Sequence, residues 1–176
     1  MSNRLFFLSA YILLLGACAV TPVEVSKHKI EALSELLGDI QPQSSFAERL
    51  QLSRDIFHKT QILAKDFELT SPPLWHNFLV NVGLRHKGLC YHWSDALYLH
   101  LKQGKYVHFS FHMVGANTGE YWTEHNALVI VNKQGHIEDG IVIDPWRDSG
   151  RLYFSKVKSD KKYIWSHRID RGCCKP

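Results

Sequence analysis

The spacing of apolar residues changes once along this chain, at Gly104. Before Gly104 the apolar residues recur at intervals of three and four, and after it they alternate with polar residues at the two-residue period of a strand. Helices followed by strands at hairpin-length spacings are typical of an α+β fold with an antiparallel sheet. We therefore predict N-terminal helices packed on an antiparallel β-sheet.

Three helices are expected before Gly104. A capping box that begins at Ser45 opens the first helix, which runs to about Glu68. Pro73 opens the second, which ends near Leu84, and the third runs from Cys90 to Gly104. Strands are expected over residues 106–113, 125–131, 140–144, 151–157 and 163–166.

Composition limits the chain to one globular domain. It has 176 residues, of which 45% are apolar, so it can form one hydrophobic core but is too short for two ordinary domains. Its 21 Lys and Arg exceed its 17 Asp and Glu by a net charge of +4, and the basic residues are spread along the chain. A nucleic-acid-binding protein usually concentrates them on one face, so we expect no nucleic-acid partner.

The N-terminus has the pattern of an export signal. Arg4 precedes an apolar run from Leu5 to Leu15, which is too short to span a bilayer comfortably. The residues that follow, Gly16, Ala17 and Cys18, resemble the lipobox of bacterial lipoproteins. The resemblance implies removal of signal peptide 1–17, lipidation of Cys18, and a membrane anchor in the cell envelope. Because Ala19 rather than Asp follows Cys18, it also implies the outer membrane, facing the periplasm.

The domain is expected to begin near Ser44. Residues 18–43 are interpreted as a tether with some helix, because Ile30, Leu33 and Leu37 recur at helical spacing before Gly38 and Pro42 interrupt the pattern. Residues 44–176 would then form the folded domain.

Cys90 is the candidate nucleophile. With Cys18 set aside, Cys90, Cys173 and Cys174 remain, an odd number for disulfide pairing in an exported protein. Cys173 and Cys174 lie at the C-terminus and are interpreted as peripheral. Cys90 follows Gly88 and occupies the first turn of the third helix, where backbone amides and the helix dipole favour a thiolate.

A nucleophilic thiol needs a base and an acceptor that orients the base. His125 precedes an apolar strand and Asp144 closes the next one before Pro145, so both can face one cleft. The order of Cys90, His125 and Asp144 resembles the transglutaminase-like branch of the papain-like thiol fold, over about residues 84–146. The resemblance implies a catalytic triad that acts through a thioester on peptide or amide bonds, with a peptide or protein substrate and no cofactor or metal. For the oxyanion, Trp75, Asn77, Asn81 or backbone amides near Cys90 are available.

Other interpretations stay open at this point. Cys90 could be a core thiol, His125 a strand cap and Asp144 part of an Asx turn. A metal site with His108 and His112 is disfavoured, because residues four apart on a strand lie roughly 13 Å apart. The alternative function is a non-catalytic envelope lipoprotein that uses the same fold to bind peptide or glycan.

Overall fold

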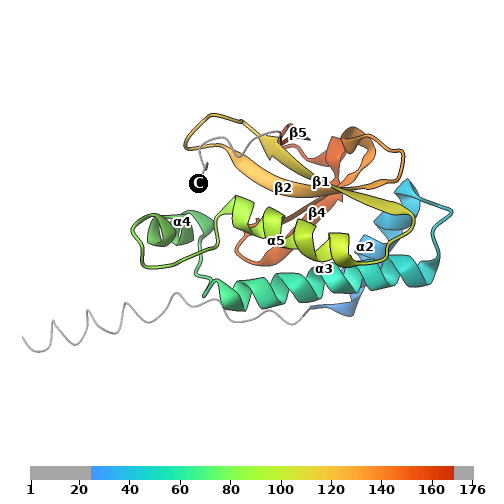
Figure 1. Cartoon of the computed structure of the whole chain (residues 1–176), viewed down its shortest axis with the longest axis horizontal. Coiled ribbons are helices and arrows are strands. Elements are labelled where there is room, and N and C mark those ends of the chain that lie inside the picture. The colour runs from blue at the N-terminus through green and yellow to red at the C-terminus, as the bar shows by residue number, and fades with distance from the viewer. Residues whose placement is uncertain (1–24, 169–176) are drawn as a thin grey trace, which may run out of the picture.

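The computed structural model describes residues 25–168, which form helices packed against one face of a sheet (Figure 1). Over this part of the chain there are four α-helices and one open antiparallel sheet of five strands. The predicted α+β class is therefore confirmed. Cys18, Cys173 and Cys174 lie outside the described residues.

The helices are α2 (Lys27–Ile40), α3 (Phe46–Asp66), α4 (Pro73–Asn81) and α5 (Cys90–Gln103). The predicted capping box begins α3, since the Ser45 side chain accepts a hydrogen bond from the backbone N–H of Glu48 at 3.1 Å. Pro73 is the first residue of α4, where its missing N–H is harmless. No helix among residues 25–168 combines the length and apolar character needed to cross a bilayer.

The sheet has the strand order β4-β3-β2-β1-β5. Its strands are β1 (Phe109–Ala116), β2 (His125–Asn132), β3 (Ile141–Asp148), β4 (Arg151–Lys156) and β5 (Ser166–His167), with short 3-10 helices at Ile137–Asp139 and Val157–Ser159. All the paired strands are antiparallel. The two-residue period after Gly104 therefore predicted the sheet correctly.

The pairing of β2 with β3 shows that each face of the sheet carries its own apolar cluster. Leu128 pairs with Ile143, and both lie on the face that carries the helices, with Trp93, Leu97 and Leu101 of α5 in the same core. Val129 pairs with Val142 on the opposite face, which Trp165 helps to cover. Since neighbouring residues of a strand alternate between faces, His125 and Asp144 belong to the second face and Asn126 to the helical face.

Three expectations differ from the structure. The strand expected over residues 163–166 is confined to Ser166–His167, and residues 163–165 lie outside any strand. Within the proposed tether 18–43, residues 27–40 form α2, whose Leu33 and Leu37 are fully buried in the main core, so the folded unit begins well before Ser44. The first strand begins at Phe109 rather than Tyr106. Tyr106 instead donates a hydrogen bond to Asp55 of α3, which holds the segment before β1 against the helices.

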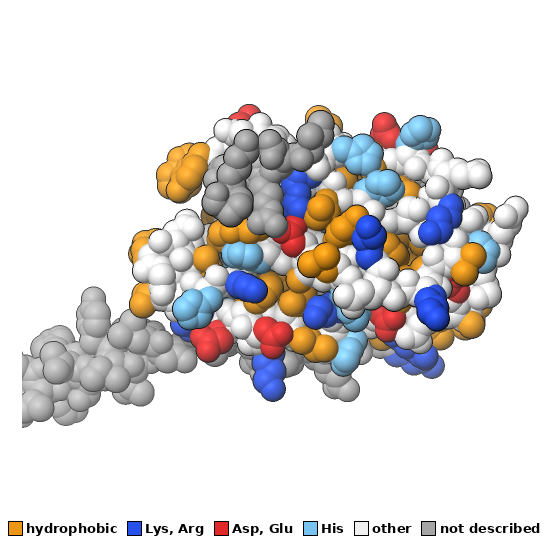
Figure 2. All heavy atoms as spheres, in the orientation of Figure 1, with side chains coloured by type: hydrophobic (Ala, Val, Ile, Leu, Met, Phe, Trp, Pro, Cys, Tyr) orange, Lys and Arg blue, Asp and Glu red, His pale blue; other side chains and the backbone are white. Residues whose placement is uncertain are grey.

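Exposed apolar side chains gather at one end of the molecule. Figure 2 shows them at the left, over α4 and at the tip of the β1–β2 hairpin. They include Leu74, Trp75, Phe78, Val82 and Leu84, together with Tyr121 and Trp122 of the hairpin. This end of the molecule also carries the N-terminus of α5, which holds Cys90.

The burial of α2 predicts how its residues respond to truncation. Leu37→Ala should lower the free energy of unfolding by about 2–5 kcal/mol, because it empties a filled position in the core. Glu35→Ala, at an exposed position of the same helix, should change it by less than about 0.5 kcal/mol. Urea unfolding followed by circular dichroism measures both, and equal effects would mean that α2 is not part of the core.

Candidate active site

Cys90 lies at the start of α5, directly after a turn that requires glycine. Its side chain is half-buried. Gly88 has φ +123°, a region that side chains other than hydrogen rarely adopt. A Cβ atom at this position would also lie 2.0 Å from Nε2 of His76. Backbone conformation and close packing therefore both explain the glycine two residues before the thiol.

His76 of α4 hydrogen-bonds the backbone of this turn. Its fully buried ring accepts a hydrogen bond at Nδ1 from the N–H of Thr70 at 3.2 Å, and Nε2 lies 2.9 Å from the carbonyl oxygen of Lys87. The ring therefore carries its proton on Nε2, which donates to Lys87. Burial lowers the pKa of His76, in keeping with a neutral ring.

Two residues of α5, His92 and Trp93, also hydrogen-bond the backbone of this turn. Nδ1 of His92 accepts hydrogen bonds from the N–H groups of Gly88 and Leu89, at 3.1 and 3.2 Å. The indole N–H of Trp93 donates to the carbonyl oxygen of Gly88 at 3.0 Å. These bonds satisfy backbone groups of the turn and fix the backbone leading into Cys90.

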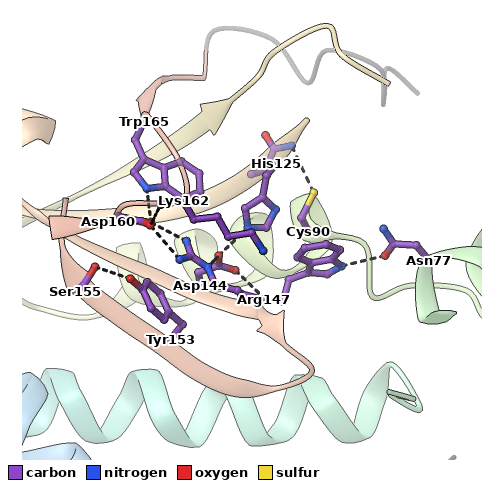
Figure 3. A network of polar contacts seen from close by, with 12 residues as sticks. Asn77, Cys90, His125, Asp144, Arg147, Tyr153, Ser155, Asp160, Lys162 and Trp165 are labelled. Carbon is purple, nitrogen blue, oxygen red and sulfur yellow. Dashed lines mark hydrogen bonds and ion pairs between the residues drawn. The ribbon is translucent and has the colours of Figure 1, made fainter. Parts of the chain in front are cut away.

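The His125 ring lies between Cys90 and Asp144 (Figure 3). Nε2 of His125 is 2.7 Å from Oδ2 of Asp144, and both side chains are buried. Nδ1 of His125 is also buried and has no hydrogen-bond partner within residues 25–168. Cys90 is close enough that its charge and a contact with its side chain both help to raise the pKa of His125. The ring nitrogen opposite Asp144 is therefore the one available to the thiol.

His125 and Asp144 each shift the pKa of the other in the direction that favours its charged form. Burial disfavours the charged ring, but Asp144 and then Cys90 outweigh burial and raise the pKa of His125 to about 9. Burial likewise disfavours the Asp144 carboxylate, but His125 and Arg147 outweigh it and hold the pKa of Asp144 below its ordinary value. At neutral pH the site therefore contains an imidazolium ion and a carboxylate.

Arg147 connects Asp144 to a second carboxylate. Its Nε donates to Oδ2 of Asp144 at 2.9 Å, and its two terminal nitrogens donate to the carboxylate of Asp160 at 3.1 and 2.7 Å. Its guanidinium also lies over the ring of Tyr153, 3.8 Å from the centroid. Asp160 accepts further hydrogen bonds, including one from the indole N–H of Trp165 at 2.9 Å. Asp144 is thus held from two sides by buried cations.

Aromatic rings surround the His125 imidazole. The centroids of Trp146 and Tyr163 each lie 4.7 Å from that of His125, and Trp165 lies at 5.5 Å. These rings keep water from the bond between His125 and Asp144, which strengthens it. The indole N–H of Trp146 donates to Oδ1 of Asn77 at 2.9 Å, which ties α4 to the site.

The structure brings Cys90, His125 and Asp144 together. Of the residues predicted as oxyanion donors, only Asn77 is connected to this site. Asn77 reaches the site through Trp146, whereas Trp75 and Asn81 are exposed. Sequence reasoning missed Asn126, Arg147, Asp160 and Arg168. Asn126 directly follows His125 and Arg147 follows Asp144 by three residues, but only the fold indicates which way these side chains turn.

His108 and His112, the two histidines considered for a metal site, have other partners. Nδ1 of His108 lies 2.6 Å from a Glu48 carboxylate oxygen, and His112 stacks edge-on against His167 at 5.2 Å. Among residues 25–168, no three His, Cys, Asp or Glu side chains are grouped so as to hold a metal ion.

Comparison with known proteins gives no family assignment. No protein-family model matches the chain, and neither the curated proteins nor the solved structures contain a match. The arrangement of the site's own residues therefore carries the functional argument.

The pair predicts a titration and its effect on stability. The His125 ring should titrate near pH 9, and Asp144→Asn should lower its pKa, because the carboxylate that opposes the effect of burial is gone. Since the folded pKa exceeds the unfolded value of about 6.5, the pair's contribution to stability is complete below pH 6.5 and is lost as the pH rises through 9.

NMR of the ring nitrogens, with urea unfolding across the same pH range, measures both effects. Asp139→Asn, which removes only a surface partner of Lys158, is the matched control and should leave the His125 titration unchanged. A wild-type ring that titrates below pH 7 would contradict the buried ion pair.

Proposed function

We propose that the protein is a thiol enzyme similar to the transglutaminase-like branch of the papain-like fold, with Cys90 as the nucleophile. The observation that carries this proposal is the His125 ring, bonded to Asp144 at 2.7 Å through Nε2 and facing Cys90 with its other side. A cysteine at a helix N-terminus, with the base and the acid on neighbouring strands, is compatible with that fold. Peptide or amide bonds are the proposed substrates.

The proposed reaction has two halves. In the resting pair the thiol proton lies on Nδ1 of His125, which makes the ring an imidazolium ion, and the electron pair of the Cys90 thiolate attacks the carbonyl carbon to form a C–S bond. The C–N bond then breaks, the leaving nitrogen receives the proton from His125, and a thioester remains. In the second half His125 deprotonates a water molecule or an amine, which attacks the carbonyl carbon of the thioester. The C–S bond then breaks, and the proton on His125 is again shared with the released Cys90 sulfur. Water gives hydrolysis and an amine gives acyl transfer.

Electrostatics support the first step. The pKa of about 9 for His125 means that the ring can hold a proton at neutral pH, provided that its counter-charges remain. Asp144 supplies one such charge, and a Cys90 thiolate would supply the second. Asp144 orients the ring and transfers no proton itself in this scheme.

Alkylation of Cys90 tests the proposal without a known substrate. In a Cys173→Ser/Cys174→Ser background, iodoacetamide should react quickly with Cys90 at pH 7. His125→Ala should slow the reaction roughly tenfold or more, because an ordinary thiol is only a few per cent thiolate at this pH. Asp144→Asn should slow it less.

Cys90→Ala should abolish turnover of a panel of fluorogenic peptide amides, while thermal unfolding shows a loss of only about 1–2 kcal/mol at this half-buried position. A rate of alkylation that His125→Ala leaves unchanged would refute the activated pair. The envelope-binding alternative, in which Cys90 is a core thiol, would then take its place.

We also propose that Cys18 carries a lipid anchor. Residues 19–26 separate Cys18 from α2, and an extended chain spans at most about 3.6 Å per residue. Because α2 belongs to the folded unit, lipidation would hold the domain within roughly 30 Å of the membrane surface.

Cys18→Ser should abolish labelling by an alkyne analogue of palmitate and release the protein from the membrane fraction. The Cys173→Ser/Cys174→Ser variant is the matched control and should remain labelled and membrane-bound. Labelling that survives Cys18→Ser would refute lipidation at this residue.

A further inference from the structure

Attack on a carbonyl group creates a negative oxygen that needs hydrogen-bond donors, and the residue beside His125 can supply one. Asn126 is buried, with 3% of its surface exposed, and its amide nitrogen lies 3.7 Å from the sulfur of Cys90. Register turns Asn126 to the helical face of the sheet and His125 to the other face. The two consecutive residues therefore approach Cys90 from different sides.

The orientation of the Asn126 amide is fixed by Arg168. A terminal nitrogen of Arg168 donates to Oδ1 of Asn126 at 3.2 Å. A guanidinium group has no acceptor, so it must face the amide oxygen, which leaves the NH₂ group directed at Cys90. Arg168 is itself almost fully buried and is held by Asp95 and by Ser94, both in α5. The amide is thus preorganised by charged and polar partners behind it.

We propose that Asn126 is a catalytic residue that stabilises the oxyanion, and that Arg168 is a positioning residue for it. This inference rests on the proposed function and deepens it. When the sulfur of Cys90 bonds to the carbonyl carbon, the π electron pair of the C=O bond moves to oxygen. Asn126 and the first-turn N–H of Cys90 donate hydrogen bonds to that oxygen without transferring a proton. When the pair returns, the C–N bond breaks and the leaving nitrogen takes its proton from His125.

The distance from the sulfur suits this role. In the tetrahedral intermediate the oxygen is two bonds from the sulfur, so a donor 3.7 Å from the sulfur can lie within hydrogen-bond reach of the oxygen. Asn77 is bonded to Trp146 on the other side of the site, whereas the amide nitrogen of Asn126 itself contacts the sulfur of Cys90. Asn126 therefore replaces the donors named from sequence, Trp75, Asn77 and Asn81, as the assigned side-chain donor.

Two reactions of the same thiol separate this role from a structural one. Acylation by p-nitrophenyl acetate forms an oxyanion, whereas alkylation by iodoacetamide forms none. The ratio of the two rate constants at one pH cancels the fraction of thiolate. In the Cys173→Ser/Cys174→Ser background, Asn126→Ala should lower this ratio on the order of 10²-fold.

Asn126→Asp keeps an acceptor for Arg168 and replaces the donor with a negative charge, so it should lower the ratio at least as much as Asn126→Ala. Asn132→Ala, at the opposite end of β2, is the matched control and should leave it unchanged.

The possible outcomes are distinct. A wild-type protein whose acylation does not depend on Cys90 overturns the proposed function and this assignment with it. Acylation that depends on Cys90, with an unchanged ratio in a folded Asn126→Asp variant, overturns only the role of Asn126. A ratio that falls in Asn77→Ala instead assigns the donor to Asn77 and also overturns it. Arg168→Lys, which keeps the charge but loses the planar fork, should lower the ratio by a smaller factor than Asn126→Asp and leave alkylation unchanged.

Discussion

The buried carboxylate of Asp144 constrains the whole site. A carboxylate without exposed surface is costly unless cations and hydrogen-bond donors surround it. Arg147 and His125 supply the charges, and the backbone N–H of Arg147 donates to the second carboxylate oxygen at 3.2 Å. This contact depends on an irregularity in the pairing of β3 with β4 between Asp144 and Asp148, which lets Arg147 turn back toward Asp144. Removing either cation would leave an uncompensated buried charge.

The thiol is positioned by a different set of forces. Hydrogen bonds between uncharged groups, made with His76, His92 and Trp93, hold the Gly88 turn. The apolar face of α5 packs in the core and fixes the helix. The site therefore combines a helix fixed by packing with strand residues fixed by charge. A change of pH that discharges His125 weakens the charged half first and leaves the helix in place.

Periodicity predicted most of the fold, because burial of one face repeats regularly along a helix or strand. At α2 the helical spacing was recognised, but the segment was assigned to a tether because Gly38 and Pro42 follow, although Leu33 and Leu37 belong to the core. In the site, the elements and the order of the chain indicated Cys90, His125 and Asp144. Arg168 could not be predicted, because its role depends on the pairing of β5 with β1, a contact between segments distant in sequence.

The alternation of a β-strand explains how the consecutive residues His125 and Asn126 reach the site from opposite faces of the sheet. Adjacent residues of β2 must point to opposite faces of the sheet, so a thiol at the end of the sheet can meet both. On one face His125 is backed by Asp144, Arg147 and Asp160; on the other, Asn126 is backed by Arg168 and Asp95. Each of these two side chains thus has an arginine–carboxylate pair behind it, in which the arginine is buried. The pair beside His125 favours the charged ring, whereas the pair behind Asn126 fixes the direction of a neutral amide.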